Sequence, residues 1–362
     1  MVHIIRIKNK LLRPAISALL LAALMCAALP ISAQAAQNTP AVSAKSAIVT
    51  SHGVSLYEKN ADMPLPMAST TKLMTAIIAL EACALDELVE IKSEYCNIEG
   101  SSMYLAAGEK YTVRELVAGL LLVSGNDAAL ALAGHIAGDS ARFAALMNAK
   151  AQALGMLNTH YTNPHGLTEK GHYTTARDLA RLMEYCMQNP AFAELDAMPQ
   201  YTTGGKVLLN HNRLLQSCPG CVGGKTGYTE AAGRCLVSCC ERDGARVVCV
   251  TLAAPDDWKD HTALYDWAYS ENTKRSVTDK LSFSVPVISG SSRWAYLVPE
   301  EELCMLIPQD KEITLRAELP WFEFAPVRAG KRGGKVTVSV DGATVTEYYL
   351  VYKEQVEEKS KQ

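Results

Sequence analysis

The chain has 362 residues, 49% of them hydrophobic and 20% charged, a composition typical of a folded globular protein and not of a disordered or fibrous one. Its net charge of −3 gives no electrostatic basis for binding nucleic acid or an anionic membrane surface, so neither is expected as a partner. The length allows one large domain and a smaller one.

Residues 1–36 have the organisation of a secretory signal peptide. They carry four cations and no acid, with an apolar run over 15–29 and then the small-residue sequence Ala33-Gln34-Ala35. The run is short for a membrane-spanning helix, which needs about 20 apolar residues, and the bulky Met25 disfavours lipid attachment at Cys26. We expect export to the cell wall or periplasm. Removal of four of the 35 cations then leaves 31 against 38 acids, a net charge of −7.

Eleven cysteines become ten after cleavage, and their spacing shows no small disulfide framework. The sequence Cys218-Pro219-Gly220-Cys221 is compatible with a local disulfide or with half of a metal site. A structural zinc site usually needs two such pairs, and the sequence has one. We therefore expect structural or free thiols, no metal and no cofactor. The other cysteines of this region lie on expected neighbouring strands: Cys235, Cys239, Cys240 and Cys249.

The first predicted elements are a hairpin and three helices. Apolar residues over 47–50 and 54–57 flank a turn sequence, which predicts the hairpin. Apolar residues recur at helical spacing over 69–84, so Ser69 is expected at the N-terminus of a helix. Thr112 and Glu115 form a capping box for a second helix, and Ser124-Gly125-Asn126 separates it from a third that opens at Asp127.

A further helix is expected from Thr175 and a short strand over 206–209, followed by a strand-rich block that a helix over 255–270 closes. Strands at both ends with helices between them indicate an α+β fold, in which a helical cluster packs around one antiparallel sheet. This assigns 37–271 to one domain. The strands of the block are predicted over 222–229, 234–240 and 246–252, the last two joined by the hairpin signal Asp243-Gly244.

From residue 272 the pattern changes to short alternating strands, which predicts an all-β domain over 272–357. Asp341-Gly342 marks a hairpin within it. The residues from Lys353 onward are charged, and we expect a solvated end to the chain with 358–362 as its tail.

Three motifs are candidates for chemistry, and the first is Ser69-Thr70-Thr71-Lys72. On a helix, residues i and i+3 share a face, so the Ser69 hydroxyl and the Lys72 amine can meet. Lys72 can act as the base that activates the serine if its pKa falls from about 10.4 toward 7 or 8. Burial and a second cation, for which Lys225 is well suited, would lower it. Taken alone, the motif favours the alternative of an exposed helix lysine.

The second motif, Ser124-Gly125-Asn126, lies between two helices, where both side chains can point into a cleft. The Ser124 hydroxyl can relay a proton between Lys72 and a leaving amine, and the Asn126 amide can bind a peptide group of the substrate. An interhelical turn with a helix cap is the alternative.

The third motif, Lys225-Thr226-Gly227, follows two glycines on an expected edge strand. We interpret the glycines as letting a substrate backbone add to the sheet edge. Lys225 and Thr226 offer a cation and a hydroxyl to a terminal carboxylate, and the amides of Ser69 and Tyr228 can form an oxyanion hole. A hairpin turn is the alternative for this motif alone, but the three motifs together indicate a serine acyl-transfer site.

With their flanking residues, these motifs resemble the serine-type D-Ala-D-Ala carboxypeptidases, the low-molecular-mass penicillin-binding proteins. The resemblance covers about 47–357 and includes Asn163-Pro164-His165-Gly166-Leu167 and His172, whose histidines it implies are structural. It implies a β-lactamase/transpeptidase-like domain followed by the family's small β domain.

The resemblance also implies residue roles. Ser69 would attack the penultimate D-Ala carbonyl of a peptidoglycan stem peptide, release the terminal D-Ala and leave an acyl-enzyme for hydrolysis. β-Lactam antibiotics would acylate the same serine as inhibitors. The implied catalytic residues are Ser69, Lys72 and Ser124, and the implied substrate-binding residues are Asn126, Lys225, Thr226, Gly227 and Tyr228.

Three features depart from the family pattern. Many relatives end in an amphipathic membrane-binding helix, whereas this sequence ends in charged residues without an apolar face, so no C-terminal membrane anchor is expected. His211 occupies a stretch where some relatives place an arginine near the substrate carboxylate, which bears on carboxylate affinity. The segment from Cys218 to Cys221, directly before Lys225, is also unusual.

Two alternative functions share the pattern. A serine β-lactamase uses the same acylation machinery, but class A enzymes deacylate with a glutamate in a Glu-x-x-Leu-Asn-like loop, and 128–224 contains no such element. A catalytically idle wall-binding protein would keep the fold, but the intact Ser69, Lys72 and Lys225 argue against it.

Overall fold

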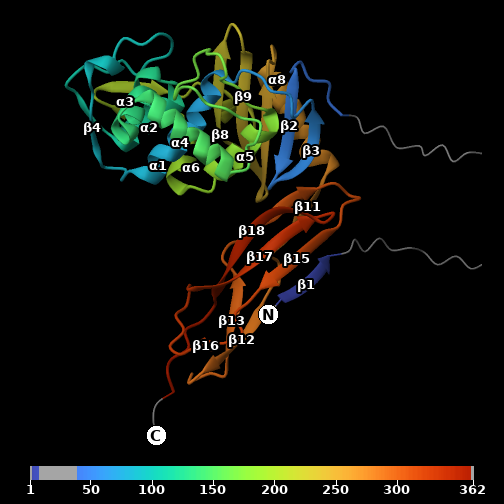
Figure 1. Cartoon of the computed structure of the whole chain (residues 1–362). Coiled ribbons are helices and arrows are strands. Elements are labelled where there is room, and N and C mark those ends of the chain that lie inside the picture. Colours follow the sequence, from blue (N-terminus) through green and yellow to red (C-terminus); the bar gives the residue numbers. More distant parts are fainter. Residues whose placement is uncertain (1, 8–38, 360–362) are drawn as a thin grey trace, which may run out of the picture. The chain divides into compact units, whose positions relative to one another are not determined.

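The computed structural model describes residues 2–7 and 39–359, which belong to two compact units (Figure 1). The predicted apolar run over 15–29 and the cleavage sequence Ala33-Gln34-Ala35 lie outside the described residues. None of the helices within 2–7 and 39–359 has the length and apolarity needed to cross a bilayer. Of the described residues, the larger unit contains Ala41–Asp279 and Glu302–Gln309, and the smaller contains 2–7, 39–40, Lys280–Glu301 and 310–359.

The larger unit is built on an antiparallel sheet in the order β8-β9-β10-β2-β3. The predicted N-terminal hairpin is confirmed as β2 and β3, and Asp243-Gly244 forms the turn between β9 and β10 with positive φ at both residues. Within the described chain β8 pairs with β9 alone, so β8 is an edge strand. The short β14 pairs with β10, in parallel, and β11 pairs with β14. The strands are β2 (Ser46–Ser51), β3 (Val54–Lys59), β8 (Cys221–Thr229), β9 (Gly233–Arg242), β10 (Ala245–Leu252), β14 (Cys304–Ile307) and β11 (Thr273–Ser276).

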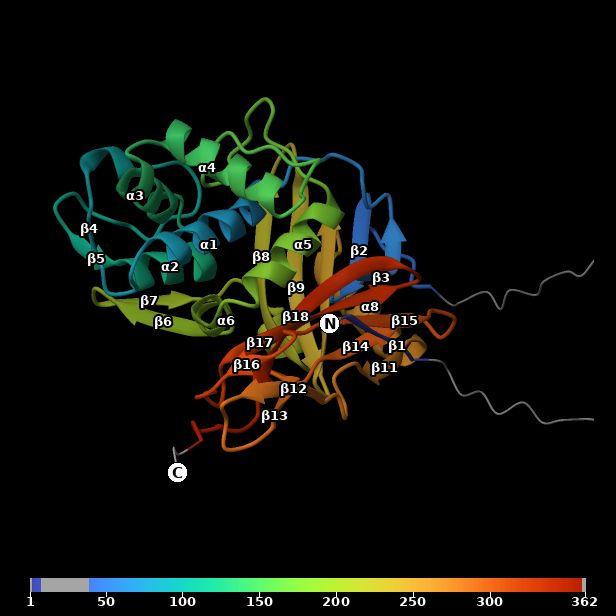
Figure 2. The same cartoon turned by 60° about the horizontal axis from the view of Figure 1, so that its bottom comes forward.

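Side chains alternate across this sheet and separate two cores. On β9, Val237 and Cys239 belong to the core beneath the helical cluster, whereas Leu236 and Cys240 face the opposite side, where Leu264 packs. Helix α5 (Ala176–Cys186) covers one face of the central strands, as Figure 2 shows. Helix α8 (Asp257–Glu271) covers the other face.

The predicted capping box opens α2: Thr112 Oγ1 accepts from the Glu115 amide, and the Glu115 carboxylate accepts from the Thr112 amide. This helix belongs to a cluster packed on the sheet face that α5 covers. The cluster and the connections around it comprise α1 (Lys72–Ala82), α2 (Val113–Leu122), α3 (Asn126–Ala137), α4 (Ser140–Ala153), α6 (Pro190–Asp196), α7 (Leu214–Ser217), η2 (Ser93–Tyr95), and the strand pairs β4 (Leu88–Glu90) with β5 (Lys110–Thr112) and β6 (Gln200–Thr203) with β7 (Lys206–Leu209).

Ser69 lies at the N-terminal end of a helical segment, as predicted, but the first turn of that segment is not α-helical. Residues Ala68–Thr71 form a 3₁₀ turn, η1, and α1 begins only at Lys72. Ala68 has a φ of +48°, and the hydroxyls of Thr70 and Thr71 donate to the carbonyls three residues earlier at 2.7 and 2.8 Å. Such side-chain to backbone bonds compete with the α-helical pattern, which sequence periodicity does not reveal.

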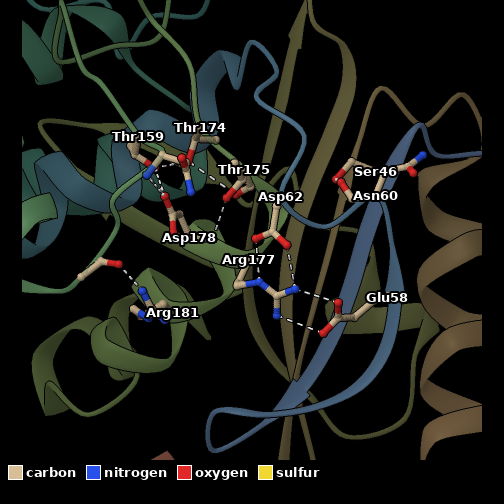
Figure 3. Close-up of polar contacts among 12 residues, drawn as sticks. Ser46, Glu58, Asn60, Asp62, Thr159, Thr174, Thr175, Arg177, Asp178 and Arg181 are labelled. Carbon is tan, nitrogen blue, oxygen red and sulfur yellow. Dashed lines mark hydrogen bonds and ion pairs between the residues drawn. The ribbon is translucent and has the colours of Figure 1, made fainter.

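An arginine on α5 connects that helix to β3 and the loop after it (Figure 3). The Arg177 guanidinium donates to both carboxylate oxygens of Glu58 at 3.0 and 2.7 Å and to both of Asp62 at 2.7 and 3.0 Å. These hydrogen bonds lower the pKa of both carboxyls. Thr175 caps the same helix by accepting from the Asp178 amide, so the start of α5 is fixed on two sides.

The smaller unit has the all-β character predicted for the C-terminal domain, with strands in the order β1-β15-β17-β18-β13-β12-β16. Two strands that fall within the range predicted for that domain, β11 and β14, belong instead to the larger unit, because β14 pairs with β10 and β11 pairs with β14. Asp341-Gly342 forms the β17–β18 turn as predicted. The expectation of a solvated chain from Lys353 is wrong at Val356, which is buried and pairs with Val327. The strands are β1 (Val2–Ile7), β12 (Phe283–Ile288), β13 (Trp294–Pro299), β15 (Ile313–Glu318), β16 (Glu323–Phe324), β17 (Arg332–Val340) and β18 (Ala343–Tyr352).

Candidate active site

Ser69 lies on η1, which packs directly against β8. A Cβ atom at position 227 would stand 3.0 Å from the Ser69 amide nitrogen and 3.1 Å from the Met67 carbonyl oxygen. Only glycine therefore lets the third motif approach the first this closely. The left-handed φ of Ala68 is a strained conformation of the kind that concentrates at functional sites.

The Lys72 amine is surrounded by three oxygens. Ser69 Oγ lies 2.8 Å from Nζ, Asn126 Oδ1 lies 2.7 Å from it, and the His165 carbonyl oxygen lies 2.6 Å from it. A neutral amine has two N–H groups and one lone pair. It can donate to Asn126 and His165 while its lone pair accepts the Ser69 proton, so the site suits a lysine that acts as a base.

The electrostatics agree with this assignment. Lys72 is fully buried, and burial is the main cause that lowers its pKa well below the ordinary lysine value. Lys225 lowers it further, as expected from two like charges, while the Asp127 carboxylate acts in the opposite direction. The exposed-lysine interpretation of the first motif is therefore wrong.

The second motif occupies the connection between α2 and α3. Ser124 has a φ of +61° and lines the same pocket as Ser69, and its buried hydroxyl has no hydrogen-bond partner among the described residues. The Asn126 amide is engaged internally, since its oxygen accepts from Lys72 and its nitrogen donates to the Glu99 carbonyl at 2.6 Å. In this structure Asn126 thus positions the lysine.

Lys225 is buried, and its amine donates to the Thr226 carbonyl at 3.0 Å. Burial lowers its pKa to about 8, opposed by the carboxylate of Asp196. Asp196 is the last residue of α6 and is fully buried. Neither of its carboxylate oxygens has a hydrogen-bond partner of standard geometry among the described residues. Burial raises its pKa to about 7, opposed by the Gly224 amide and Lys225. Asp196 is not among the predicted site residues, because no motif in the sequence around it indicates a contact with Lys225.

The glycines before Lys225 have a different role from the one that the sequence suggested. A Cβ at Gly223 would stand 2.3 Å from an Asp196 carboxylate oxygen, and one at Gly224 would stand 2.6 Å from the Val237 carbonyl. Packing within the protein therefore requires them, whatever binds at the sheet edge.

Both histidines near the first motif lack the contacts of a base or a metal ligand. His172 Nδ1 accepts from the Thr162 amide at 3.1 Å, so Nε2 carries the proton and donates to Thr71 Oγ1 at 2.7 Å. Thr71 in turn donates to the Ala68 carbonyl, which fixes the turn that holds the nucleophile. Burial lowers the pKa of His165 and of His172 to about 4, so both are neutral at pH 7.

An open pocket of about 770 Å³ contains residues of all three motifs. Beside them it is lined by His211 and by two arginines, Arg213 and Arg234. Asp257 holds the Arg234 guanidinium at 3.0 and 2.9 Å. Cations are thus available to an anionic ligand. The motif residues in the lining are Ser69, Ser124, Thr226, Gly227 and Tyr228.

Comparison with known proteins agrees with this geometry. The D-alanyl-D-alanine carboxypeptidase family (peptidase family S11) matches residues 33–256. The chain belongs to this family. The C-terminal domain of penicillin-binding protein 5 matches residues 273–358, so the family's second domain is present as well.

Individual relatives match different shares of the chain. The D-alanyl-D-alanine carboxypeptidase DacF of Bacillus subtilis is 30% identical over 86% of this chain and 85% of its own length. DacB2 of Mycobacterium tuberculosis is 37% identical over 62% of this chain and 81% of its own. The crystal structure of PBP3 from Streptococcus pneumoniae superposes with a TM-score of 0.71 at 26% identity, covering 88% of this chain and 100% of that one.

The resemblance inferred from the motifs is therefore confirmed, as is the α+β transpeptidase-like fold. The chain is a penicillin-binding D-Ala-D-Ala carboxypeptidase of the serine type.

Proposed function

We propose that this carboxypeptidase is exported and trims the terminal D-Ala from peptidoglycan stem peptides through an acyl-enzyme on Ser69. The observation that carries the proposal is the buried Lys72 amine, 2.8 Å from Ser69 Oγ, with its two donor positions occupied by Asn126 and His165. The remaining lone pair faces the hydroxyl that must lose its proton.

The reaction begins when Lys72 takes the Ser69 proton and Ser69 Oγ attacks the carbonyl carbon of the penultimate D-Ala. The amides of Ser69 and Tyr228 bind the developing oxyanion, a contribution of about 3 kcal/mol per donor in tested enzymes. The Ser124 hydroxyl, which lacks a partner among the described residues, passes a proton to the leaving D-Ala nitrogen. Water then hydrolyses the acyl-enzyme and regenerates the serine.

Substrate binding uses the pocket wall. The stem peptide lies along the edge strand β8, whose outer side is unpaired in the described chain. Its terminal carboxylate meets the Thr226 hydroxyl, within the field of Lys225, and Asn126 contacts the peptide group while it holds Lys72. A β-lactam enters by the same route and acylates Ser69.

The test compares the protein with its Ser69→Ala variant on a peptide that ends in D-Ala-D-Ala. We expect the wild type to release D-Ala and to be labelled by fluorescent penicillin, and the variant to do neither. Rapid turnover of the chromogenic cephalosporin nitrocefin would instead indicate a β-lactamase. Absence of penicillin labelling in the folded wild type would indicate an idle wall-binding protein.

A further inference from the structure

Three cysteines converge beneath the strand that carries the third motif. Cys240 on β9 is fully buried, and its sulfur lies 3.7 Å from the sulfur of Cys218. Cys221 begins β8 directly opposite Cys240 in the β8–β9 register, and interaction with the Cys240 thiol lowers the pKa of Cys221. One central thiol therefore has two partners, and only one disulfide can form at a time.

The backbone fixes this arrangement. The Cys221 amide donates to the Cys218 carbonyl at 3.1 Å, which closes a tight turn, and the Glu241 amide donates to the Gly220 carbonyl at 2.7 Å. Gly220 has a φ of +82°, and a Cβ there would stand 2.7 Å from the Glu241 carbonyl oxygen. The turn that carries two thiols is thus seated on the strand that carries the third.

The three thiols differ in access and in acidity. Cys221 is partly exposed, whereas Cys218 and Cys240 are buried. The hydrogen bond with Cys240 and the guanidinium of Arg242, 3.7 Å from the Cys218 sulfur, lower the pKa of Cys218 to about 7. Arg242 is held in place by the Asp266 carboxylate and the Pro219 carbonyl, both at 3.0 Å. A substantial fraction of Cys218 is therefore in the thiolate form near neutral pH.

We propose that Cys218, Cys221 and Cys240 form a thiol–disulfide exchange site, which accepts oxidation at Cys221 and stores it as a Cys218–Cys240 disulfide. The oxidant is a disulfide-bearing molecule outside the cytoplasm, either a low-molecular-mass disulfide or an exported protein. The site requires none of the catalytic residues and does not depend on the carboxypeptidase reaction.

Each step balances. The Cys221 thiolate attacks one sulfur of the oxidant RSSR, which gives a Cys221–SR mixed disulfide and releases RS⁻, which takes a proton. Cys240, whose pKa is raised by its interactions with Cys218 and Cys221, passes its proton to the Cys218 thiolate 3.7 Å away and attacks the Cys221 sulfur. This forms Cys221–Cys240 and releases RS⁻, which takes that proton to become the second RSH and leaves Cys218 as the thiolate. The Cys218 thiolate then attacks the Cys240 sulfur, so the disulfide moves to Cys218–Cys240 and the Cys221 thiol is regenerated. Overall, two protein thiols are oxidised and one disulfide is reduced.

The site bears on the third motif through β8. Cys221 and Lys225 lie on the same strand, and Asn212, which packs beside Gly224, donates to the Cys221 sulfur at 3.8 Å. A Cys221–Cys240 bond ties the start of β8 to β9, and its transfer to Cys218 releases it. The redox state of the three cysteines therefore acts on the strand that carries Lys225.

The test uses the reduced full-length protein, treated with oxidised glutathione, then blocked with N-ethylmaleimide and digested with trypsin. We expect a cross-link between the peptides 214–225 and 235–242, assigned by fragment ions to Cys218 and Cys240, with the maleimide on Cys221. A Cys240→Ser variant should keep glutathione on Cys221 as a stable adduct. A Cys221→Ser variant should form the same cross-link roughly tenfold more slowly, because the entry thiol is missing.

The matched control is Cys83→Ser, which removes another partly exposed thiol, at the end of α1, and should leave the rate and position of cross-linking unchanged. A disulfide between Cys218 and Cys221, or three unmodified thiols after oxidation, would overturn the proposal. If Cys240→Ser fails to fold, the wild-type map and the Cys221→Ser rate still decide.

Discussion

Lys72 shows how a single residue is prepared for catalysis by its surroundings. Three oxygens within 2.8 Å of the amine leave a neutral lysine with both N–H groups used and its lone pair directed at Ser69. An arginine at the same place would remain charged at every accessible pH. It could donate to the same oxygens, but it could not accept a proton.

We therefore expect Lys72→Arg to lose penicillin acylation by roughly 10²- to 10⁴-fold, the usual contribution of a general base. The loss should persist at high pH, because the arginine stays charged there. A lysine that was only partly protonated would lose its proton at high pH, and labelling would recover. The measurement is the rate of fluorescent penicillin labelling from pH 6 to 10. Lys92→Arg, on the exposed surface, serves as the control and should behave as the wild type. Recovery of labelling above pH 9 in Lys72→Arg would contradict the assignment.

Asp196 and Lys225 form a second residue-scale unit. Burial lowers the pKa of Lys225 to about 8, and the nearby Asp196 carboxylate keeps it from falling further. Lys225 is charged below that pH, and the protein's affinity for a terminal carboxylate should decline as the pH rises through about 8. Removing the negative charge of Asp196 lowers the pKa of Lys225 further, so the decline should begin at a lower pH.

The measurement is kcat/KM for D-Ala release as a function of pH in Asp196→Asn. We expect its basic limb to move to lower pH, with the shift expressed mainly in KM if Lys225 has the proposed role of binding the substrate carboxylate. Asp86→Asn, an exposed acid outside the pocket lining, is the control and should leave both limbs in place. An unchanged basic limb in a folded Asp196→Asn protein would show that the two groups are not coupled.

These two cases mark how far the sequence predicts the site. The spacing of Ser69 and Lys72 reveals their contact, because residues i and i+3 remain neighbours in a 3₁₀ turn as well as in an α-helix. The effect of Lys225 on Lys72 also follows from like charges once the motifs share a site. Asp196 is different, because its relation to Lys225 arises only when α6 packs under β8.

At the scale of elements, the contact between η1 and β8 assembles the first and third motifs. That contact depends on the missing side chain at Gly227, where a Cβ would press on the Ser69 amide at 3.0 Å and on the Ala68 Cβ at 3.1 Å. A displacement of the nucleophile by about 1 Å costs on the order of 100-fold in rate.

We expect Gly227→Ala to slow penicillin acylation by roughly 10- to 100-fold while the protein stays folded. The reason is displacement of η1 from β8, and because the displaced turn carries both the Ser69 hydroxyl and the Ser69 amide, the acylation rate should fall and the deacylation rate should not rise. Gly244→Ala is the matched control: its φ of +77° makes alanine strained, but no atom lies within 4 Å of the new Cβ. It should lower the melting temperature and leave acylation unchanged, and equal acylation in both variants would refute the packing argument.

Elements were predicted well where one local rule governs them. The capping box of Thr112 and Glu115 and the Asp243-Gly244 hairpin are both present, since each rests on neighbouring residues. The start of α1 was misplaced because Ala68 takes a left-handed conformation, which contacts with β8 and the Thr71–His172 hydrogen bond stabilise. Such tertiary contacts leave no periodic trace in the sequence.

At the scale of the whole molecule, the structure and the predicted signal peptide give incompatible roles to the N-terminal residues. Val2–Ile7 forms β1, paired antiparallel with β15 from Val2↔Glu318 to Ile7↔Ile313. The same residues are the beginning of the predicted signal peptide over 1–36. Export with cleavage removes β1 and leaves β15 as the edge of its sheet, so only one of the two arrangements can exist in the exported protein.

We expect cleavage, because the small residues Ala33 and Ala35 follow an apolar run as a signal peptidase requires. Intact mass and N-terminal sequencing of protein recovered from a secreting bacterial host should place the mature N-terminus at or near Gln37. A double variant with Ala33→Leu and Ala35→Leu provides the control, because bulky residues block cleavage, and it should keep the full mass. Backbone amides on the outer edge of β15 should then exchange faster in the cleaved protein than in the double variant. Wild-type protein recovered outside the cytoplasm with Val2–Ile7 still attached would show instead that β1 is a permanent strand.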